Sequence, residues 1–304
     1  MLVWKAHDKK VRSLVFSPDG TRIATTGGTS NVVWLWDAPT GRLAGKLGGG
    51  SPSPVYGVAF FPDGKHLAGN SGYDGIRIWD TETGGVVADL SNHTGSPDTI
   101  AISADGTRLV STAFGGLAEW SDPTRPTSDK PRQPDRMVSL VHPGMPQIGF
   151  SPAGNYFAVA GWYLHLHPVA IPNEIETRQF RDPTPKSPMG ASVNGFAFTP
   201  DDSRLALVLG HRAVVWKPTD LEANPVLIPG HGKMVKGVGF LPDGNVLTAG
   251  LDGTARVWDS NTGAELRSFN WGIGKVWVAA VSPDGMLCAA GSDDGHIVVW
   301  DVDL

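Results

Sequence analysis

The chain has 304 residues, of which 40% are hydrophobic, and a formal net charge of −5. This mild acidity gives no electrostatic reason to expect a nucleic acid or an anionic membrane surface as partner. The sequence contains no apolar run of about 18 residues that could span a membrane, its N-terminus lacks the apolar segment of a secretory signal, and its one cysteine, Cys288, excludes an intramolecular disulfide. We therefore expect a cytoplasmic protein with a large core.

A turn signal recurs seven times along the chain, most clearly as Pro-Asp-Gly. Its anchor residues lie 41–48 positions apart, at Asp19, Asp63, Asp105, Ala153, Asp201, Asp243 and Asp284. An apolar residue stands three positions before each anchor, at Phe16, Phe60, Ile102, Phe150, Phe198, Phe240 and Val281. A tryptophan follows six of the anchors by 15–17 positions, at Trp36, Trp79, Trp120, Trp216, Trp258 and Trp300. This regular spacing indicates a repeat architecture.

The sixth repeat, residues 230–263, shows the pattern most clearly. Its apolar runs are Val235–Phe240, Val246–Ala249 and Ala255–Trp258, separated by Pro-Asp-Gly and by Asp252-Gly253. Alternation of side chains at period two between such turns predicts short antiparallel strands.

The Gly-His before the first run, the Asp-Gly before the third and the closing Trp-Asp together resemble one repeat of the WD40 family. The resemblance covers essentially the whole chain, and repeats one, two, six and seven keep the pattern best. Repeat four departs furthest, since Ala153 is its anchor and His167 stands where tryptophan is expected. The resemblance implies an all-β fold: a single seven-bladed β-propeller of four-stranded antiparallel blades, forming one domain over residues 1–304.

The two ends of the chain complete one blade in this interpretation. The last repeat stops just after its third strand, at Trp300-Asp301. Because a blade needs four strands, and because WD40 propellers commonly close in this way, we expect Met1–Ala6 to be the outer strand of the last blade. Ser121–Pro146 contains six prolines and predicts a surface excursion without a regular ladder; a second, shorter one is expected near Pro183.

Repeat six also contains the residues of the family's polar network. The matching residues are His231, Asp252 and Trp258, with Thr248 as the possible fourth member. The resemblance implies a structural role, in which these groups hold loops to strands. A His-Asp pair could instead be half of a hydrolytic triad, but the sequence has no Gly-x-Ser-x-Gly motif beside it.

His165 and His167 are two positions apart on a predicted strand, so both are expected on one face. That spacing can bind zinc or copper, but a site needs a third ligand, and nothing brings His142 there. We favour substitution within a diverged repeat and expect neither a metal nor a cofactor.

Aromatic residues occur at the turn between the second and third strands of three consecutive repeats. They are Tyr73, Phe114, Trp162 and Tyr163. In this fold such turns lie on the face where the first strands begin, so the four residues are expected to form one arc that binds a partner. An equally weighted alternative is that these rings pack over their own blades.

We therefore expect a non-catalytic scaffold or adaptor, a monomer that binds a protein or peptide through its loop faces. The sequence alone leaves two alternatives open. One is an enzyme or metal-binding propeller that uses the central channel; the other is the sensor domain of a longer multidomain protein. Fold class by itself does not decide between them.

Overall fold

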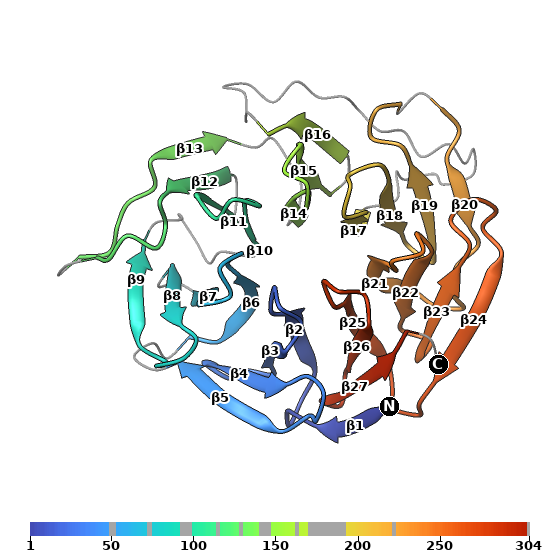
Figure 1. Ribbon diagram of the computed structural model, residues 1–304, viewed down its shortest axis with the longest axis horizontal. Helices are drawn as coiled ribbons and strands as arrows, with labels where there is room; N and C mark the ends of the chain where they lie inside the picture. Colours follow the sequence, from blue (N-terminus) through green and yellow to red (C-terminus); the bar gives the residue numbers. More distant parts are fainter. Residues whose placement is uncertain are drawn as a thin grey trace.

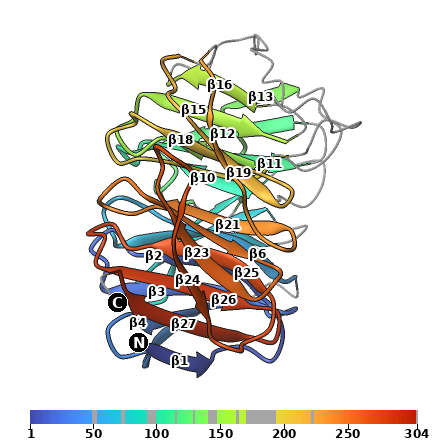
Figure 2. The same cartoon turned by 90° about the vertical axis from the view of Figure 1, so that its right-hand side faces the viewer.

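The computed structural model describes residues 1–48, 53–71, 75–91, 99–113, 116–127, 130–139, 147–161, 164–169, 193–220 and 223–302. Within these ranges every regular element is a β-strand, and the strands form seven antiparallel sheets. Figure 1 shows the sheets as blades of a ring, with the first strand of each blade near the centre, and Figure 2 shows the ring from its side. The predicted all-β, seven-bladed propeller is confirmed. The described part of the chain has no helix that could cross a membrane.

Blades one to three have four strands each. Blade one consists of β2 (Val11–Phe16), β3 (Arg22–Gly27), β4 (Val32–Asp37) and β5 (Leu43–Gly48). Blade two consists of β6 (Val55–Phe60), β7 (His66–Ser71), β8 (Ile76–Asp80) and β9 (Val86–Leu90). Blade three consists of β10 (Thr99–Ile102), β11 (Arg108–Ala113), β12 (Gly116–Ser121) and β13 (Arg136–Ser139).

In blade four the described residues form three strands, β14 (Gln147–Phe150), β15 (Tyr156–Ala160) and β16 (Leu164–Pro168). Blade five consists of β17 (Val193–Phe198), β18 (Leu205–Leu209), β19 (Arg212–Trp216) and β20 (Val226–Ile228). Blade six consists of β21 (Val235–Phe240), β22 (Val246–Gly250), β23 (Thr254–Trp258) and β24 (Glu265–Asn270). Blade seven consists of β25 (Val276–Val281), β26 (Leu287–Ser292), β27 (His296–Asp301) and β1 (Leu2–Lys5).

The ring closes between the two ends of the described chain. Strand β1 pairs antiparallel with β27, from Leu2 opposite Val299 to Lys5 opposite His296, and Figure 1 shows the two strands side by side. Trp4 also contacts Trp36 of blade one, with ring centroids 5.8 Å apart. The N-terminal segment thus completes blade seven and packs on blade one, which confirms the predicted closure.

The Pro-Asp-Gly signal makes the tight turn between the first two strands of a blade. In blade one the Ser17 hydroxyl donates to Asp19 at 2.5 Å, and the backbone N–H of Thr21 donates to the same carboxylate at 3.0 Å. Gly20 follows with φ of 71°, a conformation that glycine adopts without steric cost. The same Ser-x-Asp bond recurs at Ser103–Asp105 and at Ser282–Asp284.

The turn of blade four lacks this aspartate, and an aspartate from blade five takes over its hydrogen bonds. Asp202 accepts a hydrogen bond from the Ser151 hydroxyl at 2.5 Å and from the backbone N–H groups of Ala153 and Asn155 at 3.1 Å. Asp202 belongs to the turn of blade five, where it has a φ of 60° and only 4% exposure. The carboxylate that Ala153 cannot supply therefore comes from the neighbouring blade.

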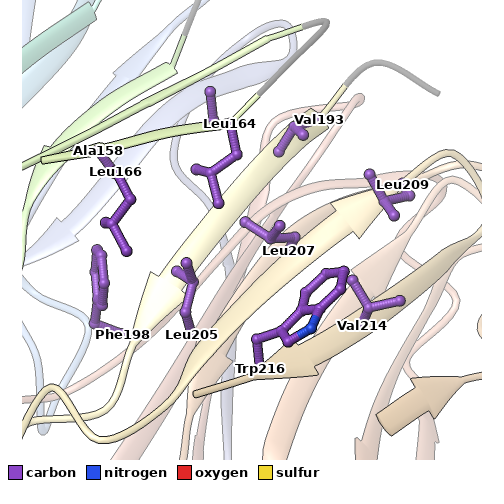
Figure 3. Packing of buried hydrophobic residues seen from close by; sticks show 11 residues of the cluster. Ala158, Leu164, Leu166, Val193, Phe198, Leu205, Leu207, Leu209, Val214 and Trp216 are labelled. Carbon is purple, nitrogen blue, oxygen red and sulfur yellow. The ribbon is translucent and has the colours of Figure 1, made fainter. Parts of the chain in front are cut away.

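The core consists of apolar layers between neighbouring blades. All six repeated tryptophans are buried, with exposures of 0–7%. Figure 3 shows one layer, in which Leu205 and Leu207 of blade five lie between Leu164 and Leu166 of blade four and Trp216 of blade five. Burial of a side chain as large as tryptophan contributes roughly 3 kcal/mol or more, so these layers hold the blades together.

The Pro-rich segment 121–146 differs in part from its prediction. Arg136–Ser139 forms β13, which pairs with β12 as the outer strand of blade three. The expectation of no regular ladder was therefore wrong here: the strand starts after the fourth of the six prolines, and an edge strand leaves one side of its backbone unpaired. Residues 140–146 and the segment near Pro183 lie outside the described residues.

Candidate interaction face

Blade six contains a closed polar network around His231. Nδ1 of His231 lies 3.0 and 3.2 Å from the two carboxylate oxygens of Asp252, and its Nε2 lies 2.8 Å from the Thr248 hydroxyl. Trp258 Nε1 donates to that same hydroxyl at 2.7 Å. Because an ionised carboxylate only accepts, Nδ1 carries the proton, and Thr248 donates to Nε2. The structure thus brings together all four residues that the sequence grouped.

The protonation states of this pair follow from its surroundings. Burial alone raises the pKa of Asp252, but hydrogen bonds from His231 and Thr254 outweigh it and lower the pKa to about 2. Burial lowers the pKa of His231, although Asp252 opposes this shift. Asp252 also accepts from the backbone N–H groups of Gly232 and Thr254, at 3.0 and 3.1 Å. A charged Asp252 therefore ties two loops to a neutral His231.

Blade one has the same network without the carboxylate. His7 Nε2 lies 2.9 Å from the Thr25 hydroxyl, which accepts from Trp36 Nε1 at 2.8 Å. Thr29 stands where blade six has Asp252, in a turn closed by the matching backbone bond from Ser30 to Gly27. Burial lowers the pKa of His7 to about 4, and the charge of Asp8 opposes this shift.

The four residues proposed for partner binding lie outside the described residues. These residues are Tyr73, Phe114, Trp162 and Tyr163. The described strands fix where their connections begin and end: β7 to β8, β11 to β12, and β15 to β16. The arc therefore stays a prediction.

His165 and His167 are both buried on β16, with exposures of 7% and 4%. His167 pairs with Phe157 in the register, as Trp120 pairs with Leu109 in blade three, so it occupies the tryptophan position. Burial lowers the pKa of His167. No group of three His, Cys, Asp or Glu side chains able to hold a metal occurs among the described residues, and His142 lies outside them.

A set of large side chains at the start of the inner strands was not predicted from the sequence. In blades six, seven, one and two the second residue of the inner strand is Lys236, Trp277, Arg12 or Tyr56. Each lies where the strand pairing is irregular. With Lys10 they form what we call the basic-aromatic band. The signal was present: all four stand four positions before the recurring apolar residue.

Cation–π contacts connect the members of the band. Lys10 Nζ lies 3.5 Å from the centroid of the Trp277 ring, and Lys236 Nζ lies 5.6 Å from it. Arg12 lies 4.7 Å from the Tyr56 ring centroid, and its Nε donates to Gly28 O at 2.7 Å. The pKa of Lys10 is lowered by burial and by the charges of Arg12 and Lys236. Three cations therefore face one another on a protein whose net charge is negative.

Four segments of the chain match the family model described as WD domain, G-beta repeat (WD40). They are residues 1–37, 41–80, 224–259 and 265–301. Each ends at or just after the third strand of a blade, and those blades are one, two, six and seven. The prediction that these repeats keep the pattern best is confirmed.

The chain is similar to three longer proteins. It is 24% identical to Denticleless protein homolog of Danio rerio over 298 residues, which cover 85% of this chain and 45% of that protein. It is 24% identical to Autophagy-related protein 16 of Arabidopsis thaliana over 310 residues, covering 97% and 48%. It is 23% identical to Protein tipD of Dictyostelium discoideum over 304 residues, covering 98% and 40%. The chain spans less than half the length of each of these relatives. Together with the seven blades and the closure by β1, the matched repeats show that the chain belongs to the WD40-repeat β-propeller family.

Proposed function

We propose that this chain is a non-catalytic scaffold that binds a protein or peptide partner on the face where its inner strands begin. WD40 propellers typically serve as platforms for protein interactions. The observation that carries the proposal is the basic-aromatic band, because Arg, Trp and Tyr are the residues enriched at binding hot spots. The described strands before Tyr73, Phe114, Trp162 and Tyr163 end beside the start of their inner strands, with Ser71 opposite Val55, Thr112 opposite Thr99 and Ala160 opposite Gln147, which supports placing the predicted arc on this face.

The hydrogen bonds of blade six favour a scaffold over a hydrolase. A catalytic His-Asp pair needs a nucleophile that substrate can reach. The hydroxyl on the far side of His231 belongs to Thr248, which has 0% exposure and also holds Trp258. We infer a structural role for this network, as the family resemblance implies.

The remaining details of the proposal are a monomer in a reducing, cytoplasmic compartment, without cofactor. Cys288 is buried, and burial together with Asp301 raises the pKa of its thiol to about 12, which suits an unreactive core cysteine. The coverage of the three relatives supports a second candidate, a recognition domain within a longer protein. The metal-binding alternative predicts stoichiometric zinc or copper in protein purified without a histidine tag.

A pull-down from cell extract with the intact chain tests the proposal. Trp277→Ala and Trp162→Ala are each expected to weaken capture of the specific partner at least tenfold, with little change in melting temperature. Leu266→Ala is the matched control, because Leu266 is a large apolar residue, 50% exposed, on the outermost strand of blade six. Equal capture by all four proteins would contradict this binding face.

A further inference from the structure

A pocket of about 370 Å³ lies beside His7 in blade one. Its lining includes His7, Lys9, Gly28, Thr29, Ser30 and Trp34. His7 is buried, with an exposure of 7%, and it forms part of the pocket wall. Trp34 forms another wall and stacks on Trp36 at 5.8 Å between ring centroids. The pocket thus joins a buried imidazole to solvent-accessible polar groups.

Blade six shows which group this kind of site accepts. There the carboxylate of Asp252 bonds to His231 Nδ1 and to the backbone N–H of the next residue, Gly232. In blade one the Nε2 side is complete through Thr25, but among the described residues nothing bonds to His7 Nδ1. Thr29 has a hydroxyl and no carboxylate, so it does not replace Asp252. The blade-one pocket therefore lacks the carboxylate that the equivalent place in blade six contains.

The charges around the pocket favour an anion. Lys9 lines the pocket, and Arg12 is held against its turn by the bond to Gly28 O. Lys10 follows directly and belongs to the basic-aromatic band. Asp8 is the one carboxylate in the lining, and its side chain is exposed to solvent. Lys9, Lys10 and Arg12 outnumber the nearby carboxylates, which are Asp8 and the Asp293 whose charge acts on Lys10, and this excess attracts a negatively charged segment.

The same chain already replaces a lost carboxylate from outside the repeat that lost it. Blade four lacks its turn aspartate, and Asp202 of blade five takes over the bonds to Ser151, Ala153 and Asn155. A carboxylate from a separate segment can thus satisfy this fold's polar groups as well as one from the repeat itself. In blade one no described segment of the chain does so.

We propose that the pocket beside His7 binds a side-chain carboxylate of an acidic peptide segment in the protein partner. The carboxylate accepts a hydrogen bond from His7 Nδ1, as Asp252 does from His231, while Lys9, Lys10 and Arg12 attract the flanking acidic residues. The inference rests on the proposed scaffold function and names the chemistry of its partner.

Titration of the isotope-labelled chain with capped hexaglutamate, followed by NMR of the histidine ring nitrogens, tests the proposal. The His7 resonances are expected to move and those of His231 to stay, because Asp252 already occupies the blade-six position. Capped hexalysine is expected to leave both unchanged. Equal movement of both histidines, or no movement of His7 at millimolar peptide, would overturn the proposal.

Thr29→Asp places the carboxylate within the chain and is expected to weaken hexaglutamate binding at least tenfold. Ser268→Asp makes the same charge change on the exposed outer strand β24 and is expected to leave the affinity unchanged. Lys9→Ser, at an exposed position outside the turn, should weaken binding several-fold even where Thr29→Asp disturbs the turn. If Thr29→Asp captures the protein partner from extract as well as the wild type does, the carboxylate pocket is wrong and the scaffold proposal stands.

Discussion

Blades one and six contain the same His-Thr-Trp network, and they differ in the group that completes it. In blade six Asp252 closes the network and ties the residue after His231 to the turn. In blade one Thr29 stands in that place, yet the distances between His7, Thr25 and Trp36 match those in blade six within 0.1 Å. The carboxylate is therefore not needed to position the imidazole, the hydroxyl and the indole.

Strand pairing positions the hydroxyl and the indole, and a backbone bond holds each histidine: His7 N–H donates to Gly295 O and His231 N–H donates to His211 O. Thr25 and Thr248 each lie on the second strand of a blade, and the tryptophans lie on the third strand, which is paired to it. The carboxylate has a different effect, because it fastens the loop before the first strand and fills the space beside the histidine. Its absence from blade one leaves a pocket and a histidine that burial alone keeps neutral.

Removal of residues 1–6 should have the largest effect, and it should destabilise blades seven and one rather than blade six. The change deletes β1, exposes the edge of β27 and removes Trp4 from Trp36. We expect a loss of more than about 4 kcal/mol in unfolding free energy, a melting temperature lower by many degrees, and aggregation. Thermal melts and light scattering measure this, with a chain lacking only Met1 as control. Equal stability of the two chains would contradict the closure as a stabilising contact.

Acid should destabilise blade one through His7. Its pKa is about 4 in the folded chain, against 6.5 for a histidine in an unfolded chain, so the unfolded chain takes up the proton first as the pH falls. The stability from neutral His7 is complete above pH 6.5 and is lost between pH 6.5 and about 4, by about 3 kcal/mol. Asp252 affects stability over a lower pH range. Because its pKa is lowered, its contribution to the free energy of unfolding is lost only as the pH falls from 3.8 towards about 2.

Urea unfolding of wild type and His7→Gln between pH 7 and 4 measures the His7 contribution. The variant is expected to lose less stability over this range than the wild type. His231→Gln is the matched change in blade six, where Asp252 opposes the lowering of the histidine pKa. Identical pH dependence of wild type and His7→Gln would show that His7 is not the responsible group.

Thr25→Val and Thr248→Val compare the part that the two blades share. Each change keeps the side-chain shape but leaves a buried indole N–H and a histidine nitrogen without a partner. We expect each to cost about 2 kcal/mol, and the two costs to agree within about 1 kcal/mol. A large cost in blade six alone would mean that Asp252, and not the threonine, organises the network. Chemical denaturation measures both.

Asp252→Ala and Thr29→Ala compare the position at which the blades differ, and Thr29→Ala is expected to have the smallest effect of this series. Asp252→Ala leaves the backbone N–H groups of Gly232 and Thr254 without the carboxylate and His231 Nδ1 with only the Thr254 hydroxyl, so it should cost on the order of 1–3 kcal/mol. Thr29 is exposed, so its replacement should change stability by less than about 0.5 kcal/mol. Loss of a hydrolytic activity in Asp252→Ala without loss of stability would instead support the catalytic alternative.

Much of this fold could be predicted from local sequence, because each repeat has its own strand and turn signals. Pro-Asp-Gly at Asp19 indicated a turn, and the run Val235–Phe240 matched β21 at both ends. The Pro-rich segment was harder, since the outer strand β13 has four residues and little alternation. Outer strands have one solvent-facing edge, so their sequences are less constrained and give weaker signals.

The candidate site could be predicted only in part. The residues of the blade-six network were identified because a resemblance to a repeat specifies their spacing. The basic-aromatic band was missed, because Lys236, Trp277 and Arg12 belong to different repeats and approach one another only around the ring. The predicted arc with Trp162 remains a proposal.

The sequence by itself determined the number of blades, the turn positions and the His231–Thr248–Trp258 network of blade six, because these depend on how often the repeat recurs and on spacings within it. The tertiary structure decided what happens where a repeat has lost a residue. It brings Asp202 of blade five to the turn of Ala153, and it leaves the place beside His7 to a pocket. The physical reason is that a buried polar group can be satisfied by any segment within hydrogen-bond distance, and only the packing of blades around the ring determines which segment that is.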